Sequence, residues 1–376
     1  MEFDVKIAQS AIWQRLVKTY ENEKVGTAYL FSGPRGSGKE ALAIEFGALL
    51  NSTKETKNNY TQSKGYLLFR GLVHEHLKLV VPLPSPKTIK TNQDILYTLS
   101  DKDLAFLNNA IETKAKEPFY KIRMPKATRI LIHSIRELRR TLYLKSIASG
   151  RKIVLIFDAH TMSMGQGEAG NALLKILEEP PANTTLILVS DHKMNLLPTI
   201  ISRCQNVDFP PLSDKIIQDQ LTEKGLDPET VNFYAGLAQG DMQRALAIAE
   251  LPLSDLKALI NSLVNTVTSK DAKRWREFIN SYARLTNSDP DEFKFNFYLL
   301  QLWFRAAYRL RSGIPDQLHI PGLLERMETI NQKYPRANYA EINLLLERSM
   351  AAIARNLYMS LNLTNLLTGI NQQLQG

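Results

Sequence analysis

Short apolar runs alternate with longer amphipathic stretches over the first 210 residues. The runs are rich in apolar and β-branched side chains, and they cover residues 28–31, 153–157, 184–189 and 206–209. Such short runs predict buried strands. The stretches between them have helical spacing or consist of helix formers, and they cover residues 8–20, 40–50, 101–116, 134–148 and 169–177. Strands that alternate with helices predict a parallel sheet covered on both faces.

After Pro210 and Pro211 the pattern is helical throughout. Short helices are expected at residues 214–223, 228–239 and 242–249. Longer helices follow, and each of two predicted apolar faces has a period near 3.6. The faces consist of Phe297, Leu300, Phe304 and Ala307, and of Ile342, Leu346, Ile353, Leu357 and Leu361. The predicted fold class is α/β plus all-α, with an α/β domain at 1–210, a small helical domain at 211–251 and an all-helical domain at 252–376.

Residues 52–125 interrupt the alternation with a polar stretch and a proline-rich stretch, and we interpret them as an irregular insertion. The chain has a formal net charge of +9, and residues 52–150 alone contain 18 Lys and Arg against 8 Asp and Glu. A positive field concentrated in one region suits contact with a polyanion. The alternative is a solvated lysine-rich insertion that only keeps the protein soluble.

The composition is that of an ordinary globular protein, with 44% hydrophobic and 23% charged residues among 376. No apolar run is long enough to cross a bilayer. The first ten residues contain acidic side chains and no apolar core, so a signal peptide is not expected. Cys204 is the single cysteine, which excludes an intramolecular disulfide and a cysteine-rich zinc site. These features together predict a cytoplasmic protein.

Residues 33–39 follow the G-x-x-x-x-G-K pattern of a phosphate-binding loop, between an expected strand and an expected helix. In such loops the glycines let backbone N–H groups surround a phosphate, and the lysine adds a positive charge. The next position should be Ser or Thr, whose hydroxyl binds Mg²⁺, and here it is Glu40. The loop therefore binds a phosphate or is a tight turn with an empty cradle. The candidate residues are Gly33, Arg35, Gly36, Ser37, Gly38, Lys39 and Glu40.

The apolar run at residues 153–157 ends in Asp158, followed by Ala159. An apolar strand that ends in Asp is the pattern that orients Mg²⁺ in phosphate-loop folds. Asp158 is therefore a second candidate position of the nucleotide site.

Two further segments resemble those of a known family. Residues 171–181 read NALLKILEEPP, and residues 202–204 read Ser-Arg-Cys. Together they resemble the AAA+ subunits of the bacterial sliding-clamp loader of DNA polymerase III. The segment AYLFSGP at 28–34 and the segment GDMQRAL at 240–246, which is similar to a G-x-x-R-x-A-L lid motif with its arginine one position later, extend the resemblance from residue 8 to roughly residue 251.

The resemblance implies a P-loop domain at 1–210, a helical lid at 211–251 and a collar domain at 252–376 that joins subunits. Active loader ATPases have Glu where this chain has Ala159, and Glu168 and Glu178 are not positioned by sequence to replace it. Together with Glu40, this places the chain nearest to the non-hydrolysing delta-prime branch of the family.

The resemblance also implies roles for three more residues. Arg203, in the Ser-Arg-Cys motif, would reach the γ-phosphate of a neighbouring subunit as an arginine finger in trans, since a guanidinium is always charged and fits phosphoryl oxygens. On the residues alone, Arg203 could instead cap a helix or pair with a local carboxylate. Ser190 and Arg244 would be sensors of the phosphates, and Arg244 equally fits a surface arginine on a helix.

The expected cofactor is weakly bound ATP or ADP. No zinc is expected, because the cysteines of the zinc module that most family members carry are absent. His74 and His76 make at most half a metal site and instead correspond to the entry of a strand in the family. The implied partners are the gamma/tau ATPase and delta subunits, the sliding clamp and primer–template DNA, and no membrane.

Other functions remain open. An active AAA+ ATPase motor on DNA is disfavoured by Glu40 and Ala159. A small-molecule P-loop kinase would leave the Ser-Arg-Cys segment, the lid motif and the helical C-terminal part unexplained. A plain DNA-binding protein would use the basic region and would show salt-dependent binding as an isolated chain.

Overall fold

The computed structural model describes residues 4–52, 60–85, 95–144, 150–354 and 357–376. The chain divides into two compact units. The first comprises residues 1–217 and 240–244, and the second comprises residues 218–239 and 245–376. The predicted domain boundaries after residues 210 and 251 stay predictions.

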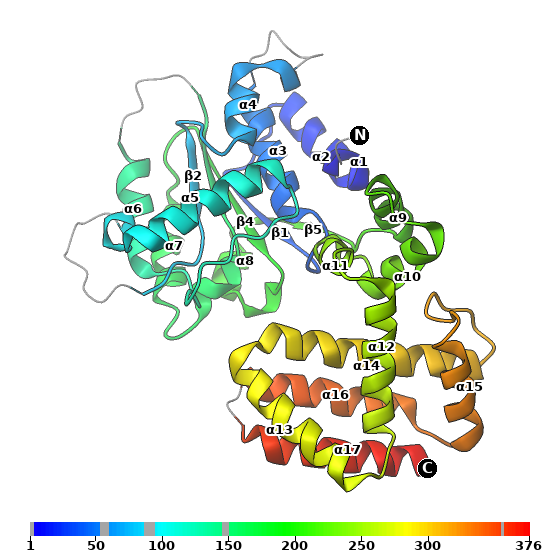
Figure 1. Ribbon diagram of the computed structural model, residues 1–376. Coiled ribbons are helices and arrows are strands. Elements are labelled where there is room, and N and C mark those ends of the chain that lie inside the picture. The colour runs from blue at the N-terminus through cyan, green and yellow to red at the C-terminus, as the bar shows by residue number, and fades with distance from the viewer. Residues whose placement is uncertain (1–3, 53–59, 86–94, 145–149, 355–356) are drawn as a thin grey trace. The chain divides into compact units, whose positions relative to one another are not determined.

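A five-stranded sheet forms the centre of the first unit, in the order β2-β3-β4-β1-β5 (Figure 1). Each strand pairs with its neighbours in parallel. This confirms the α/β part of the predicted fold. The strands are β1 (Ala28–Ser32), β2 (Leu77–Val80), β3 (Lys152–Ile156), β4 (Thr184–Ser190) and β5 (Gln205–Asp208).

Strand β2 corrects the interpretation of residues 52–125 as an insertion. It pairs with β3, where Leu77 lies opposite Ile153, so this region supplies an edge strand of the sheet. Of its four residues only Leu77 and Val80 are buried. Lys78 interrupts the apolar residues of this four-residue edge strand, so it gives only a short apolar run. The strand entry that the family resemblance placed at His74 and His76 is its one signal.

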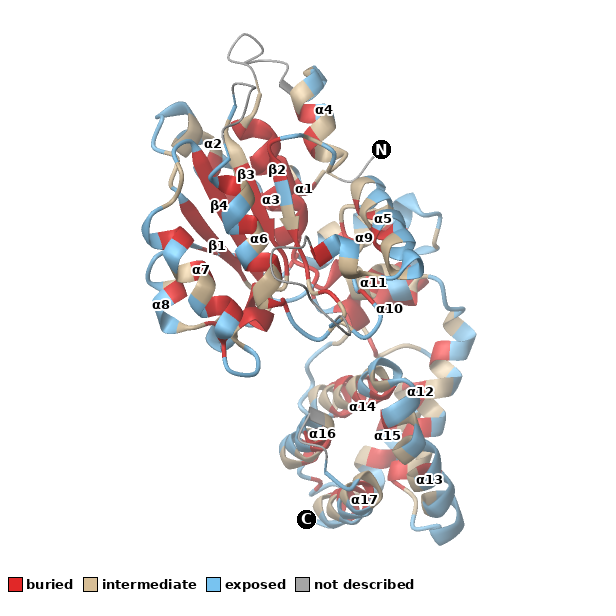
Figure 2. Cartoon of the chain, turned by 90° about the vertical axis from the view of Figure 1, so that its left-hand side faces the viewer, coloured by how far each residue is buried: buried red, intermediate tan, exposed pale blue. Residues whose placement is uncertain are grey.

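Both faces of the sheet are covered by helices. In β3, Ile153 and Leu155 belong to a core cluster with residues of α3 (Lys39–Leu50). Val154 and Ile156 belong to a cluster with residues of α6 (Ile132–Leu142) and α7 (Glu168–Glu178). Successive side chains of a strand point to opposite faces, so each central strand serves both clusters. The central strands β1, β3 and β4 are consequently coloured mainly as buried in Figure 2 and are mainly apolar runs in the sequence.

Helices of the first unit surround this sheet, and two of them differ from the prediction. The helix expected at 8–20 is divided at Gln9, whose buried side-chain amide donates a hydrogen bond to the carbonyl of Ser37 at 2.8 Å. The helix expected at 134–148 begins at Ile132 and ends at Leu142. Residues 145–149, which include the end of the predicted helix, lie outside the described residues. The helices are α1 (Val5–Ala8), α2 (Ser10–Glu21), α3 (Lys39–Leu50), α4 (Lys64–Arg70), α5 (Asp101–Lys116), α6 (Ile132–Leu142), α7 (Glu168–Glu178) and α8 (Pro198–Ile201).

The chain after β5 is helical, as predicted. Helix α14 supplies the centre of the C-terminal helices, since the expected face of Phe297, Leu300, Phe304 and Ala307 is fully buried. No helix in the described part of the chain is long and apolar enough to cross a membrane. The helices are α9 (Asp214–Glu223), α10 (Pro228–Ala238), α11 (Met242–Ile248), α12 (Leu253–Val267), α13 (Ala272–Ser288), α14 (Pro290–Arg311), α15 (Leu324–Lys333), α16 (Tyr339–Ala354) and α17 (Met359–Gln375).

The second predicted face is wrong in its last part. Ile342 and Leu346 are buried, but α16 ends at Ala354 and a new helix, α17, packs against it. Leu357 and Leu361 are exposed, on either side of the start of α17. Apolar spacing alone does not distinguish one long helix from two successive helices whose apolar residues continue the same period. The predicted apolar face therefore extended past the end of α16.

Candidate phosphate-binding site

The phosphate-binding loop lies between β1 and α3, as the motif predicted. Gly38 has a left-handed backbone, with φ of 86°, and begins α3 as its N-cap. Gly36 has φ of 69°, and a Cβ atom there would collide with the carboxylate of Asp241. Left-handed conformations and close approach to another chain segment both favour glycine. The loop glycines are therefore required by the local geometry itself.

Lys39 does not point into open space. Its Nζ atom lies 2.8 Å from Oδ1 of Asp191 and 3.2 Å from Oγ of Ser37, and it also donates to the carbonyl of Pro34. Asp191 directly follows Ser190, the last residue of β4. The carboxyl ends of parallel strands meet at one edge of the sheet, which brings this carboxylate to the loop. The lysine expected to hold a phosphate is thus bound by an internal carboxylate.

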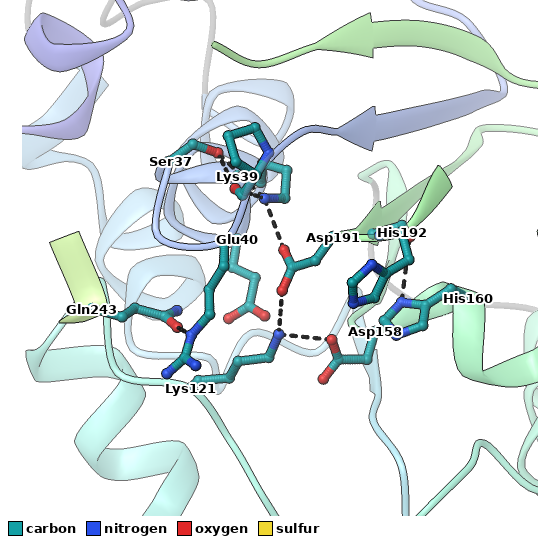
Figure 3. A network of polar contacts seen from close by, with 12 residues as sticks. Ser37, Lys39, Glu40, Lys121, Asp158, His160, Asp191, His192 and Gln243 are labelled. Carbon is teal, nitrogen blue, oxygen red and sulfur yellow. Dashed lines mark hydrogen bonds and ion pairs between the residues drawn. The ribbon is translucent and has the colours of Figure 1, made fainter. Parts of the chain in front are cut away.

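A second lysine, Lys121, connects Asp191 to Asp158. Its Nζ atom lies 2.7 Å from Oδ1 of Asp158 and 2.8 Å from Oδ2 of Asp191 (Figure 3). Lys121 comes from the segment between α5 and α6, whereas Asp158 follows β3 with a left-handed backbone at φ of 51°. The four side chains of Lys39, Asp191, Lys121 and Asp158 form a continuous chain of ion pairs, which we call the cradle network.

The charges of the cradle network stabilise one another. Burial alone would raise the pKa of Asp191, but Lys121 and Lys39 outweigh burial and hold this pKa well below its usual range. Burial alone would lower the pKa of Lys121, but the carboxylates of Glu40, Asp158 and Asp191 outweigh it and raise this pKa above its usual range. Asp191 and Lys121 are therefore both charged at neutral pH.

Glu40, which stands where a hydroxyl ligand of Mg²⁺ is expected, pairs with Lys114 of α5. The Nζ atom of Lys114 lies 2.6 Å from Oε2 of Glu40 and donates to the carbonyls of Pro118 and Tyr120 at 2.9 and 2.7 Å. Burial lowers the pKa of Lys114, against the attraction of Glu40. Both carboxylates at the predicted metal positions, Glu40 and Asp158, therefore have lysine partners.

Ser190, the expected γ-phosphate sensor, is buried at the end of β4 beside two histidines. Its Oγ accepts a hydrogen bond from the backbone N–H of His192 at 3.0 Å and lies 3.3 Å from Nδ1 of His160. Burial lowers the pKa of His160. A phosphate reached by Ser190 would therefore also meet the imidazole of His160.

Arg35 and Arg244, two other predicted site residues, flank the buried Asp241. The Nε atom of Arg35 lies 3.8 Å from Oδ2 of Asp241 and donates to Oε1 of Gln243 at 2.9 Å. Arg244 lies 3.9 Å from the same oxygen. The backbone N–H of Met242 donates to the carbonyl of Gly36 at 3.3 Å. This contact fixes the loop against residues 240–244 and brings both arginines to one carboxylate.

Arg203 lies outside the cradle network, at the surface between α8 and β5. It donates to Oε1 of Glu178 at 2.7 Å and to the carbonyl of Thr199 at 3.1 Å. Within the single chain this is the local carboxylate pairing that the sequence left open. The neighbouring Cys204 is buried, and burial raises the pKa of its thiol to about 12.

Sequence reasoning found the loop and Asp158 but missed three residues that complete the site. Asp191 carried a weak signal, because it directly follows a predicted strand in the sheet. Lys114 and Lys121 carried none, since they lie in a basic region whose placement depends on contacts with residues 74 and 70 positions away. The basic region is therefore, in part, an internal source of positive charge.

Comparison with known proteins now decides the family. A family model described as DNA polymerase III, delta subunit, matches residues 8–213 of the chain. The chain belongs to this family. The resemblance to clamp-loader subunits that the motifs indicated is confirmed.

Relatives of this clamp-loader chain carry matching names. It is 27% identical over 229 residues to DNA polymerase III subunit delta' of Bacillus subtilis (strain 168). The aligned residues cover 61% of this chain and 56% of that protein. It is 28% identical over 202 residues to the delta' subunit of Pseudomonas aeruginosa, covering 54% and 47%. It is also 28% identical over 261 residues to the tau subunit of Bacillus subtilis, covering 67% and 38%. The chain thus spans roughly half or less of the length of these relatives.

A solved structure of a DNA polymerase III gamma subunit-related protein from Thermotoga maritima covers 96% of this chain at 18% identity, with a TM-score of 0.40. That score is too low to carry an argument. The fold of the clamp-loader chain therefore stands on its own sheet and helices.

Mg²⁺, which accompanies nucleotides in phosphate-loop enzymes, does not fit the residues of this cradle. It requires near-octahedral oxygen ligands at about 2.0–2.1 Å, and the available carboxylates of Glu40 and Asp158 already accept from lysine ammonium groups. Among the described residues, no group of three or more His, Cys, Asp or Glu is placed to hold a metal ion. No metal-assisted step is therefore assigned to this chain.

Proposed function

We propose that this chain is a non-hydrolysing subunit of the bacterial clamp loader of DNA polymerase III. In this proposal it supplies Arg203 as an arginine finger, in trans, to a neighbouring gamma/tau ATPase while the complex places the sliding clamp on primer–template DNA. The delta subunit is a further partner. The observation that carries the proposal is the contrast between a cradle filled with internal ion pairs and an arginine of the family's Ser-Arg-Cys motif at the surface.

The proposal that the chain does not hydrolyse ATP is supported by three positions. Glu40 replaces the hydroxyl ligand, Ala159 replaces the acid that would activate water, and Asp158 accepts an ion pair from Lys121. Ala159 is fully buried at the start of a short 3-10 turn. A phosphoryl transfer at this cradle would lack both a metal ligand and a general base.

Nucleotide binding by the cradle itself, on this proposal, is weak. ATP or ADP would need to displace the carboxylate of Asp191 from Lys39, where the two groups lie 2.8 Å apart. Ser190 and Arg244 would then contact the phosphates as sensors. An anion that first has to break a partly buried ion pair binds with reduced affinity.

The availability of Arg203 follows from the exposure of its ion pair. The side chains of Arg203 and Glu178 are 37% and 49% exposed. An exposed ion pair contributes about 0–1 kcal/mol, so exchanging Glu178 for a triphosphate costs little. A guanidinium so placed can bind phosphoryl oxygens of a neighbouring subunit without refolding of this chain.

The test is DNA-stimulated ATP hydrolysis by a clamp loader reconstituted from this chain and the gamma/tau and delta subunits of its source. Arg203→Ala is expected to lower single-turnover hydrolysis at the site that it faces by about 10³–10⁵-fold, while ATP binding persists. The steady-state rate of ATP hydrolysis by the whole complex is expected to fall by the fraction that this one site contributes. Arg140→Ala, which removes an exposed arginine paired with Glu137 at 2.9 Å, is the matched control and leaves the rate unchanged.

Two outcomes would contradict the proposal. An unchanged rate for Arg203→Ala in an assembled complex would remove the finger. Turnover of ATP by the isolated chain at about one per second or faster, the ordinary range of enzymes, would favour the second candidate, an active AAA+ motor on DNA.

A further inference from the structure

Lys121 occupies an unusual place for a lysine. Its ammonium group bridges two carboxylates, at 2.7 Å from Asp158 and 2.8 Å from Asp191, that follow the neighbouring strands β3 and β4. The other oxygen of Asp191 lies 2.8 Å from the loop lysine, Lys39. One positive charge is thus held between the aspartate that ends β3 and the phosphate-binding loop, as Figure 3 shows.

The bridge is largely closed to solvent. The side chains of Lys121, Asp158 and Asp191 are 12%, 17% and 16% exposed. Charges at this depth are screened less than those of surface pairs, and removing one partner leaves an uncompensated charge. By contrast, the pair of Lys193 and Asp208 at the end of β5 is open to water, with Asp208 at 71% exposed.

The charges within the cradle network, and those of the adjoining Lys114–Glu40 pair, balance without any ligand. Lys39 and Lys121 oppose Asp158 and Asp191, and Lys114 opposes Glu40. A divalent cation placed near Asp158 would therefore lie beside an ammonium group. The ammonium group repels a divalent cation about twice as strongly as a monovalent one at the same distance, because the energy scales with the product of the charges.

We infer that Lys121 is a built-in cation that takes the place of a divalent metal ion between Asp158 and Asp191. The ammonium neutralises the carboxylate that would orient the metal and joins it to the residue beside the phosphate-binding lysine. The cradle is consequently independent of divalent metal, and any phosphate that enters it does so without a metal ion. Removal of the ammonium leaves two carboxylates facing one position, which is a ligand set that divalent cations prefer.

The test uses Mn²⁺ as the probe, measured by loss of its free electron paramagnetic resonance signal in the full chain. The wild-type chain is expected to bind no Mn²⁺ at the cradle. Lys121→Met is expected to bind one Mn²⁺, with a Kd at least about tenfold below the highest Mn²⁺ concentration at which the wild type shows no binding, because a nearby positive charge has been removed. Adding Asp158→Asn to that variant abolishes the binding.

Two variants separate the charge of Lys121 from its packing. Lys121→Arg retains the positive charge and is expected to bind no Mn²⁺. Lys121→Gln retains an N–H donor without the charge and gives the same readout as Lys121→Met if the methionine variant does not fold. Lys193→Met, which removes the lysine of the exposed pair with Asp208, is the matched control and leaves Mn²⁺ binding unchanged.

The inference is overturned by either of two results. One is Mn²⁺ binding by the wild-type chain that is lost in Asp158→Asn. The other is a folded Lys121→Gln or Lys121→Met chain that binds no more Mn²⁺ than the wild type. Both results concern the cradle of this chain alone and do not depend on whether Arg203 acts on a neighbour, so the inference and the proposed function can fail separately.

Discussion

The ammonium group of Lys114 lies 2.6 Å from the carboxylate of Glu40, on a lysine side chain with no exposed surface. The pair joins α5 to the first turn of α3, directly after the phosphate-binding loop. Glu40 therefore does more than replace a hydroxyl ligand: it holds a segment from the middle of the chain against the loop. A Ser or Thr at this position would leave the ammonium of Lys114 without its carboxylate.

The first prediction concerns this pair. Lys114→Met leaves the buried Glu40 carboxylate uncompensated and is expected to lower the free energy of unfolding by about 3–5 kcal/mol. Lys114→Met combined with Glu40→Gln removes both charges and is expected to cost clearly less than the single change. Urea unfolding of Lys114→Met, Glu40→Gln, the double variant and the wild type measures the coupling. Additive effects of the two changes would show that the pair is not coupled.

The second prediction concerns pH and follows from Asp191. Its folded pKa is held below the usual range by Lys121 and Lys39, which outweigh the opposing effect of burial. The resulting stabilisation is fully present above the unfolded pKa of about 3.9 and is lost as pH falls from there towards the folded pKa. The free energy of unfolding of the wild type should therefore fall more steeply below about pH 4 than that of Asp191→Asn. Parallel curves for the two proteins would contradict the assignment.

The third prediction concerns Gly36, which combines a left-handed backbone with close approach to Asp241. Gly36→Ala is expected to destabilise the fold by more than about 1 kcal/mol, because alanine disfavours positive φ and its Cβ atom displaces a buried carboxylate. Gly225→Ala is the control, since Gly225 has φ of 85° with no atom within 4 Å of the added Cβ position. The difference in urea unfolding between the two variants isolates the collision, and equal losses would exclude it.

The fourth prediction separates the two roles open to Arg203. Glu178→Gln weakens its ion pair in the single chain and leaves the arginine in place. The free energy of unfolding is expected to change by no more than about 1 kcal/mol, because the pair is exposed. ATP hydrolysis by the reconstituted clamp loader is expected to persist, unlike that of Arg203→Ala. If Glu178→Gln lowers hydrolysis as much as Arg203→Ala does, the ion pair is what matters and the finger role is contradicted.

The strands with the plainest sequence pattern are those buried on two faces. Strands β1, β3 and β4 are continuous apolar runs because helices cover both sides of the sheet. β2 was not detected from its pattern, because Lys78 interrupts its short apolar run and the strand lies in a region with polar and proline-rich stretches. The break before α17 was missed because the spacing of Leu357 and Leu361 continues a helical pattern although both side chains are exposed.

The residues of the candidate site likewise divide into those that the sequence predicted and those that it did not. The loop and Asp158 could be identified because their residues are adjacent in sequence and repeat a known spacing. The lysines that neutralise Glu40 and Asp158 could not, because Lys114 and Lys121 reach them only after the sheet has assembled. Local patterns specify which groups a loop presents, whereas the charges that surround it depend on contacts distant in sequence.

Cys204, beside Arg203, has a practical consequence for experiments on the assembled protein. It is the only thiol in the chain, it is buried, and its pKa of about 12 keeps it protonated at neutral pH. The thiolate is the nucleophile that attacks thiol-reactive dyes, so the protonated native residue is a poor target. A cysteine introduced at the exposed Met194 would accept a fluorophore selectively without removal of Cys204. The approach of a labelled neighbour could then be followed by energy transfer with the native thiol left in place.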